Sequence, residues 1–563
     1  MLRLQFLRDE NSFWFLDAFL GTIFFISSLL LFSKIGLKPE LAAFLLLPGW
    51  FLKSTVKIES KLVFYAIAVL FIGGISYWVQ GGLLASNANY ALMYFNVDTP
   101  FTLMIAQSIQ QSSEYPPKLL ENEGMSLMYH YGYHIGLSFL SSISGLKIHV
   151  VHSLVLLPWM FFLQVGLIIS IVKKVSGIKL IYAAACALLI WLSYQQYLFN
   201  YLNPNTLKNL IVLPNRYTAL YPLGPSTFEG PFILAVIWLL WIKRSGAFLL
   251  STILVILIPL FKIPLAPVVG MGFGLSALHF AWKEKKWVYL IYPSVAAVGM
   301  FVVFKLFSAA VSVAPPIEFF SMSHVQKDQW LSILIPIVIL FLIHFLTKKK
   351  VLSNNNSWLL AFVFPMPILL LFINIQDVNT WQLIAVVPFT AWFISVLILV
   401  KNRELLKPIY KKGLIGLSVF ILIIPISNAV VYVSNLLNTP VIGHEYCSNK
   451  LIEKTLKHIP LKENVIATND LRYPAENFSR DGSQFQFSAL FGHQMKVSDL
   501  SYLITLDFLK QALEFQSKLP QSIPSKEDLE FLKSKDVTHF VLAKSDVNLE
   551  GRPVVEYKTV VVK

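Results

Sequence analysis

The feature that most constrains this chain is a succession of apolar runs, each close to the length of about 20 residues that an α-helix needs to cross a bilayer. Hydrophobic residues make up 56% of the 563-residue chain and charged residues only 14%, against about 25% in soluble globular proteins. This composition predicts a polytopic membrane protein and excludes a soluble enzyme and a disordered protein. The two cysteines, Cys186 and Cys447, give no disulfide framework and no cysteine-ligated metal site.

Reading the apolar runs as helices predicts a mainly α-helical bundle with about 13 membrane spans, of which the second, sixth and seventh are short. The expected spans are residues 13–33, 40–52, 62–80, 151–172, 179–198, 230–242, 246–261, 265–282, 287–307, 330–347, 357–374, 382–400 and 413–433.

The distribution of charge predicts how these spans are oriented. The chain carries a net charge of +15, yet residues 435–563 contain 16 basic and 16 acidic residues, so the whole excess lies in residues 1–434. Lys and Arg gather in every second loop, as expected for cytoplasmic loops, which places the N-terminus inside and the C-terminus outside. The orientation accounts for the basic excess, so no nucleic-acid partner is expected. The clusters are Arg3, Arg8; Lys53, Lys57, Lys61; Lys173, Lys174, Lys179; Lys243, Arg244; Lys283, Lys285, Lys286; Lys348, Lys349, Lys350; and Lys401, Arg403, Lys407, Lys411, Lys412.

The chain divides into a membrane domain, residues 1–434, with a large first outer loop at 81–150, and a small extracytoplasmic α/β domain, residues 435–563. The second part has mixed charge and no spanning run. Its patterns predict helices at 445–458, 501–518 and 525–535, the last with Ser525 as a helix-start signal, and strands at 464–468, 537–543 and 554–562.

The first outer loop contains the strongest candidate for chemistry, Asp98, in an apolar and aromatic stretch just before Thr99-Pro100. The following residues, 100–110, have a helical pattern. Asp98 could therefore cap that helix by accepting from its first amide groups. It could also serve as a general base or a metal-contacting carboxylate at the membrane surface, and the two roles are compatible.

Further along the same loop, Glu114 adjoins Pro116-Pro117, and a Tyr-His-Tyr-Gly-Tyr-His stretch precedes the next span. His130 and His134 would share one face of a helix, a spacing that suits zinc, but no third ligand stands nearby and HExxH is absent. Tyrosines and histidines at a membrane interface are the simpler interpretation. Tyr131, His130 and His134 would also suit the binding of phosphate or sugar hydroxyls.

Other polar residues converge on the same outer side. Arg216 and Glu229 occupy the next expected outer loop, and Lys262 lies in an apolar outer turn, FKIPLAP. Ionisable residues at membrane depth are candidates for function. The alternative for Lys262 is a lysine that extends along the apolar surface to the interface.

Taken together, these elements resemble the GT-C-type integral-membrane glycosyltransferases, in particular uncharacterised bacterial and archaeal members. The resemblance is carried by Asp98-Thr99-Pro100-Phe101, Pro116-Pro117, Tyr129-His130-Tyr131-Gly132 and the C-terminal stretches 464–472 and 538–546. It extends over most of the chain by layout, but its motifs cover only short segments.

The resemblance implies an enzyme that transfers a sugar, with inversion, from a polyprenyl-phosphate donor to a glycan, lipid or protein acceptor. It places the site on the outer face of a prokaryotic plasma membrane. Asp98 would be the base or the contact for a divalent ion, Mg or Mn, and Arg216 and Lys262 would hold the departing lipid phosphate. Many members place two acids close together in this loop, whereas here the acid following Asp98 is Glu114, so the resemblance leaves metal dependence open.

Two other classes remain open on the sequence alone. Pro and Gly interrupt several runs, as in transporters, so a transporter or flippase of cell-envelope glycan precursors is the main alternative. A non-catalytic assembly protein with the same layout is the other. A nucleotide-dependent enzyme is not expected, because the chain has neither a Walker A motif nor a GxGxxG strand–helix turn and the site would face away from cytosolic nucleotides.

Overall fold

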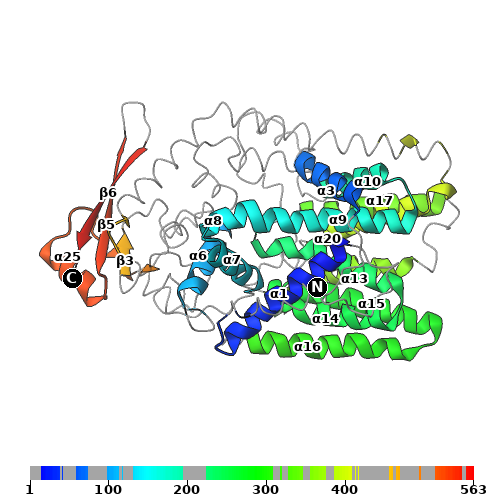
Figure 1. The fold of residues 1–563 in the computed structure, drawn as a ribbon, viewed down its shortest axis with the longest axis horizontal. Coiled ribbons are helices and arrows are strands. Elements are labelled where there is room, and N and C mark those ends of the chain that lie inside the picture. The colour runs from blue at the N-terminus through cyan, green and yellow to red at the C-terminus, as the bar shows by residue number, and fades with distance from the viewer. Residues whose placement is uncertain are drawn as a thin grey trace.

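The computed structural model describes residues 14–38, 59–73, 98–112, 131–193, 224–307, 317–319, 327–346, 356–375, 386–406, 456–460, 465–468, 494–495, 514–515, 517–547 and 553–562, with a few single positions between them. Helices dominate these residues and form one elongated bundle, with a small sheet beyond the end where α6 and α8 lie (Figure 1).

The helices of the bundle follow the apolar runs of the sequence. They are α1 (Trp14–Lys34), α3 (Ser60–Gly73), α6 (Asp98–Gln111), α7 (Gly132–Ser144), α8 (Ile148–Val151), η3 (His152–Leu156), α9 (Leu157–Ser176), α10 (Leu180–Ser193), η4 (Gly224–Phe228), α13 (Glu229–Ile242), α14 (Ser245–Phe261), α15 (Leu265–Glu284), η5 (Trp287–Leu290), α16 (Ile291–Phe307), α17 (Lys327–Leu346), η6 (Ser357–Phe362), α18 (Pro365–Phe372), α20 (Val387–Lys401) and η7 (Arg403–Leu405).

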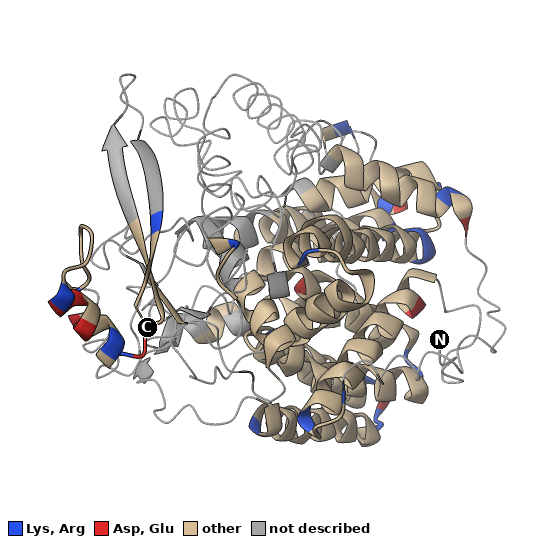
Figure 2. Cartoon of the chain, turned by 60° about the vertical axis from the view of Figure 1, so that its left-hand side comes forward, with Lys and Arg blue, Asp and Glu red and all other residues tan. Residues whose placement is uncertain are grey.

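Four helical stretches are long and apolar enough to cross a membrane: Trp14–Lys34, Ile148–Ser176, Leu265–Glu284 and Trp287–Phe307. Six further apolar helices in the described residues are 10–17 residues long. Charged side chains are sparse on the helices of the bundle, in contrast with helix α25 (Lys526–Ser534) near the C-terminus (Figure 2). The described helices of the bundle are therefore predominantly apolar. The expected total of 13 spans stays a prediction, because the runs at 40–52 and 413–433 fall almost entirely outside the described residues.

Close packing between α1 and α9 depends on a glycine. A Cβ at Gly166 would lie on the Phe15 ring, so the absence of a side chain lets α1 approach α9. The Trp159 indole N–H also donates to the Thr22 hydroxyl at 3.1 Å. The first helix is thus fixed against a helix that begins more than a hundred residues later in the chain.

One predicted span is interrupted. Residues 357–374 were expected as one helix, but the structure has the 3₁₀ helix η6, a bend, α18 and then strand β2 (Ile373–Ile375). Pro365 and Pro367 explain the break, because proline lacks the amide hydrogen that a continuous helix needs and clashes with the preceding turn. Strand β2 pairs antiparallel with β1 (Ile317–Phe319), an element that the sequence did not predict.

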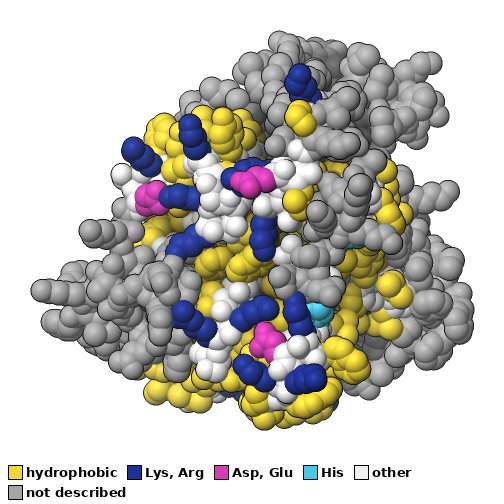
Figure 3. All heavy atoms as spheres, turned by 90° about the vertical axis from the view of Figure 1, so that its right-hand side faces the viewer, with side chains coloured by type: hydrophobic (Ala, Val, Ile, Leu, Met, Phe, Trp, Pro, Cys, Tyr) yellow, Lys and Arg dark blue, Asp and Glu magenta, His cyan; other side chains and the backbone are white. Residues whose placement is uncertain are grey.

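Basic residues gather at the end of the bundle that faces the viewer in Figure 3. Helices α9, α13, α15 and α20 all end there. Lys243 at the end of α13 lies 3.6 Å from Glu284 at the end of α15, and Lys173 on α9 pairs with Glu59 at 2.6 Å. These are the loops that the alternation of basic clusters assigned to one side, so the structure brings several of the predicted clusters together at a single end.

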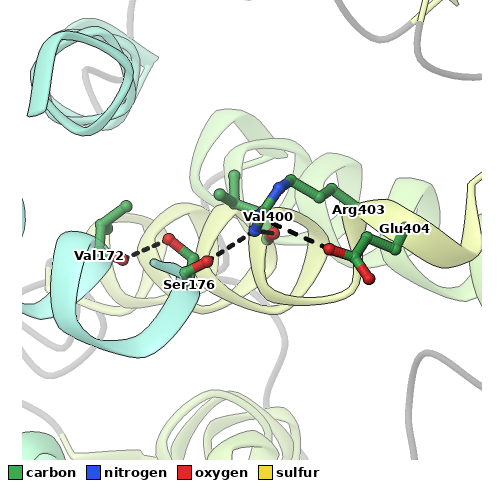
Figure 4. Close-up of polar contacts among 5 residues, drawn as sticks. All are labelled: Val172, Ser176, Val400, Arg403 and Glu404. Carbon is green, nitrogen blue, oxygen red and sulfur yellow. Dashed lines mark hydrogen bonds and ion pairs between the residues drawn. The ribbon is translucent and has the colours of Figure 1, made fainter. Parts of the chain in front are cut away.

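An arginine joins two of these helix ends (Figure 4). Arg403 Nη1 donates to the carbonyl oxygen of Ser176 at 2.6 Å and to that of Val400 at 3.3 Å, and Nη2 lies 3.9 Å from Glu404. The last carbonyl groups of a helix have no intrahelical partner and carry partial negative charge. Arg403 therefore satisfies the ends of α9 and α20 at once.

The C-terminal part forms a four-stranded sheet in the order β4-β3-β5-β6. Strand β3 (Val465–Thr468) is parallel to β4 (Gln494–Met495) and β5 (His539–Val547), whereas β6 (Pro553–Val561) is antiparallel to β5. Helix α25 is preceded by a capping box in which Ser525 and Asp528 bond reciprocally. The predicted strands at 464–468, 537–543 and 554–562 and the helix at 525–535 are confirmed, and the expected helices at 445–458 and 501–518 lie mostly outside the described residues.

Candidate functional site

A group of buried polar side chains lies where α7, η3, η4, α13 and the end of α14 meet, away from the basic end of the bundle. Gly132, the first residue of α7, makes this convergence tight. A Cβ at this position would lie 2.7 Å from Phe261 Cδ1 and 2.8 Å from the Leu260 carbonyl oxygen. Since carbon atoms cannot approach so closely, only glycine lets the start of α7 sit against the end of α14.

At the centre of this group Glu229 and Lys262 form a buried ion pair. Glu229 Oε1 and Lys262 Nζ are 3.8 Å apart, and the side chains are 7% and 10% exposed. Glu229 begins α13, and Lys262 follows the last residue of α14 in an extended backbone conformation. A buried charge is costly unless an opposite charge is near, so each residue makes the other tolerable in this apolar setting.

The structure gives a more exact position for both of these candidate residues. Glu229 was expected at the end of an outer loop, directly before the span 230–242, and it is the first residue of α13. The Lys262 side chain is buried against Glu229, and its position relative to a membrane interface stays a prediction.

Beside the ion pair, a buried tyrosine contacts a buried histidine. The Tyr133 hydroxyl and His152 Nδ1 are 2.7 Å apart, and both residues are almost fully buried. His152 begins η3, a π-helical turn in which the Leu157 amide reaches back to the His152 carbonyl. Pro158 follows and has no amide hydrogen to donate, which disturbs the regular ladder at this point. Such π-turns inside helices are frequent at functional sites.

An aromatic layer connects the two polar pairs. The Tyr133 ring lies 6.0 Å from that of Phe228, and Phe228 lies 4.8 Å from Phe261, measured between centroids. Phe228 directly precedes Glu229, and Phe261 directly precedes Lys262. Each charged residue therefore follows a buried ring, and the packing of the two rings brings Glu229 and Lys262 together in apolar surroundings.

Two of the predicted site residues, Tyr131 and His134, join this group. Both are buried at the start of α7, and the His134 ring lies 6.5 Å from that of Tyr131 and 5.9 Å from that of Tyr133. His149, one helical turn before His152, is buried as well. Within the residues that the structure describes, no three His, Cys, Asp or Glu side chains are grouped so as to hold a metal ion.

Asp98 is the first residue of α6, in agreement with the predicted helix start; its side chain lies outside the described part of the chain. Residues 102–106 of α6 are buried, and the helix contacts both α8 and η4. Asp98 therefore begins a helix that packs directly on the segment leading into Glu229. The other predicted residues, Glu114, His130 and Arg216, lie outside the described residues.

Sequence reasoning missed the partnership of Tyr133 with His152. A signal for it was present, since three of the 11 histidines, His134, His149 and His152, fall within a short and otherwise apolar stretch. Several ionisable side chains close together in or beside an apolar helix are candidates for a functional site.

No protein-family model matches the chain, and a search of curated proteins finds no match either. The interpretation of function therefore depends on the residues themselves.

Proposed function

We propose that this chain is a membrane glycosyltransferase that moves a sugar from a polyprenyl-phosphate donor to an acceptor on the outer face of the membrane. The observation that carries the proposal is the buried Glu229–Lys262 pair, because η4, which leads into Glu229, contacts α6, the helix that Asp98 begins. A cation fixed in an apolar setting, close to a helix that begins with a candidate base, suits transfer from a lipid phosphate. The resemblance of the sequence to GT-C-type enzymes supports the same assignment.

In this proposal Lys262 provides positive charge for the phosphate of the departing lipid. The bond between the anomeric carbon and the phosphate oxygen breaks, and the polyprenyl phosphate leaves with the electron pair. A fixed cation stabilises this developing charge more strongly in an apolar site than in water. Glu229 keeps Lys262 in place, and Arg216 would supply a second cation.

Asp98 acts on the acceptor. Its carboxylate takes the proton from an acceptor hydroxyl as that oxygen bonds to the anomeric carbon from the opposite side, which inverts the configuration. A contact between Asp98 and Mg or Mn is the other role compatible with its position. Tyr131 and His134 would bind sugar or phosphate oxygens beside it, together with His130 and Glu114.

The proposed membrane placement goes further than the apolar helices alone. We propose about 13 spans in a prokaryotic plasma membrane, with the N-terminus inside, the C-terminal domain outside and the site facing outward. The gathering of basic residues at the end of the bundle away from α6 and α8 supports this orientation, because cytoplasmic loops are enriched in Lys and Arg. Cytoplasmic labelling of a cysteine introduced at position 550 would contradict it.

The test compares the wild-type protein with Asp98→Asn in detergent or proteoliposomes. Each is incubated with a panel of radiolabelled polyprenyl-phosphate sugars, with and without divalent ions. Loss of a general base typically lowers the rate by about 100-fold or more. Glu404→Gln is the matched control, since this carboxylate is 87% exposed at the basic end and should be dispensable.

Turnover that is lost in Asp98→Asn and kept in Glu404→Gln would support the proposal. Turnover kept in both variants would retain the transferase but remove Asp98 as its base. Donor binding without turnover in the wild type would favour a flippase or transporter, and absence of both would leave neither function supported.

A further inference from the structure

A surface groove of about 690 Å³ lies at the basic end of the bundle, away from the proposed site. Helix α15 lines most of the groove, and Trp287, the first residue of η5, lines the rest. Its lining residues are Leu275, Leu278, His279, Trp282, Lys283 and Trp287. Those on α15 are spaced three or four residues apart, so they share one face of the helix.

The groove changes character along the helix axis. Leu275 and Leu278 at its inner end are each 43% exposed, and Trp282 and Trp287 further along are 75% and 57% exposed. Lys283 lines the outer end. Apolar, then aromatic, then cationic groups are the order in which an acyl chain, a glycerol ester region and a phosphate follow one another in a membrane leaflet. Tryptophan in particular concentrates at the level of the lipid head groups.

The charge around the outer end is positive and is fixed by the local structure. Lys285 directly follows α15 in a left-handed conformation, with φ 54°, and the Lys286 side chain after it is 63% exposed. Glu284 lies 3.6 Å from Lys243 and 3.9 Å from Lys286, and it accepts from the Tyr289 hydroxyl at 2.9 Å. Residues 283–286 contain three lysines and one acid, Glu284, so this turn carries a formal positive excess that favours an anion.

We propose that this groove is a binding site for an anionic phospholipid of the leaflet at the basic end. The phosphate would lie at Lys283 and Lys286, the glycerol region between Trp282 and Trp287, and an acyl chain along Leu275 and Leu278. The proposal depends on the membrane placement proposed above but not on glycosyl transfer, and lipid binding can be measured without any sugar donor.

Native mass spectrometry of the full-length protein in detergent tests the proposal. Phosphatidylglycerol and phosphatidylcholine with identical acyl chains are added separately, and the retained lipid is counted at increasing collision energy. We expect phosphatidylglycerol to be retained preferentially. Each lysine near an anionic head group contributes about fivefold in affinity, so Lys283→Gln with Lys286→Gln should lower retention by about 10-fold or more.

The matched control removes two basic groups elsewhere at the same end, Lys174→Gln with Lys179→Gln, and should retain phosphatidylglycerol as the wild type does. Trp282→Ala tests the aromatic contact on a side chain exposed enough to spare the fold. Equal retention of both lipids by the wild type, or equal loss in the control, would overturn the proposal. Competition by millimolar glycerol phosphate would do so too, because it would reveal a site for free anions rather than for a lipid.

Discussion

Removing one member of the buried ion pair should destabilise the protein much more than removing both. In Glu229→Gln the Lys262 ammonium remains in an apolar pocket with no carboxylate beside it, and in Lys262→Met the reverse applies. A lone buried charge of this kind typically costs about 3–5 kcal/mol. Replacing both residues leaves no charge behind, so the double variant should cost far less than the sum of the two single variants.

The size of the coupling follows from the structure. Two unit charges 3.8 Å apart, the distance between Glu229 Oε1 and Lys262 Nζ, attract each other by about 4 kcal/mol at an effective dielectric constant of about 20. Both side chains are at most 10% exposed, so little of this attraction is lost to screening by water. We therefore expect a coupling free energy of about 4 kcal/mol between the two positions.

The assay is a double-mutant cycle on the free energy of unfolding, measured by titrating dodecyl maltoside micelles with sodium dodecyl sulfate. The four proteins are wild type, Glu229→Gln, Lys262→Met and the combination. A coupling below about 1 kcal/mol, the range of exposed pairs, would refute the argument that burial gives this pair its strength.

Three further predictions concern local geometry and pH. Gly132→Ala should lower the free energy of unfolding by about 1–3 kcal/mol, because its methyl group would be forced against Phe261. Gly274→Ala, where the nearest neighbouring atom is 4.0 Å away, should be nearly neutral in the same unfolding assay. Equal effects of the two substitutions would refute the close approach at Gly132. Ser525→Ala removes the capping box and should cost about 1 kcal/mol, seen as about fivefold faster amide exchange in α25, and unchanged exchange would contradict it. Burial lowers the pKa of His539 below its usual 6.5, so the unfolded chain binds the proton first and the sheet should lose stability as the pH falls below about 6.5. Exchange of the β5 amides, corrected for intrinsic rates, should show this loss of stability. The loss should be smaller in His539→Asn, and an equal loss in that variant would show that another group is responsible.

The positions of the helices could be predicted because the length of an apolar run is a local property. The run at 13–33 appears as Trp14–Lys34 and the run at 265–282 as Leu265–Glu284. The helix start at Ser525 is local too, since a hydroxyl followed three residues later by an acid satisfies the first amide groups within one turn. Pro365 and Pro367 also indicated the break, but the continuous apolar composition of 357–374 favoured a single span.

The partnerships in the candidate site could not be predicted in the same way. Glu229 and Lys262 were both recognised as candidates, but their pairing depends on α13 and α14 returning side by side. The contact of Tyr133 with His152 likewise requires that the start of α7 lies against the π-helical turn η3. Tertiary contacts of this kind link positions whose separation in sequence carries no periodic signal.

The packing of α1 has a consequence for biosynthesis. The Phe15 ring fills the space above Gly166, and Thr22 accepts from Trp159, so the contacts of the first helix wait for residues made well over a hundred positions later. With the membrane placement proposed above, α1 would enter the bilayer during synthesis before these partners exist. In that placement it would lack its contacts with α9 for that interval, and its 21 residues and mean hydropathy of 2.1 would let it span the membrane without them. Once α9 is made, its contacts through Gly166 and Trp159 would pack α1 into the bundle.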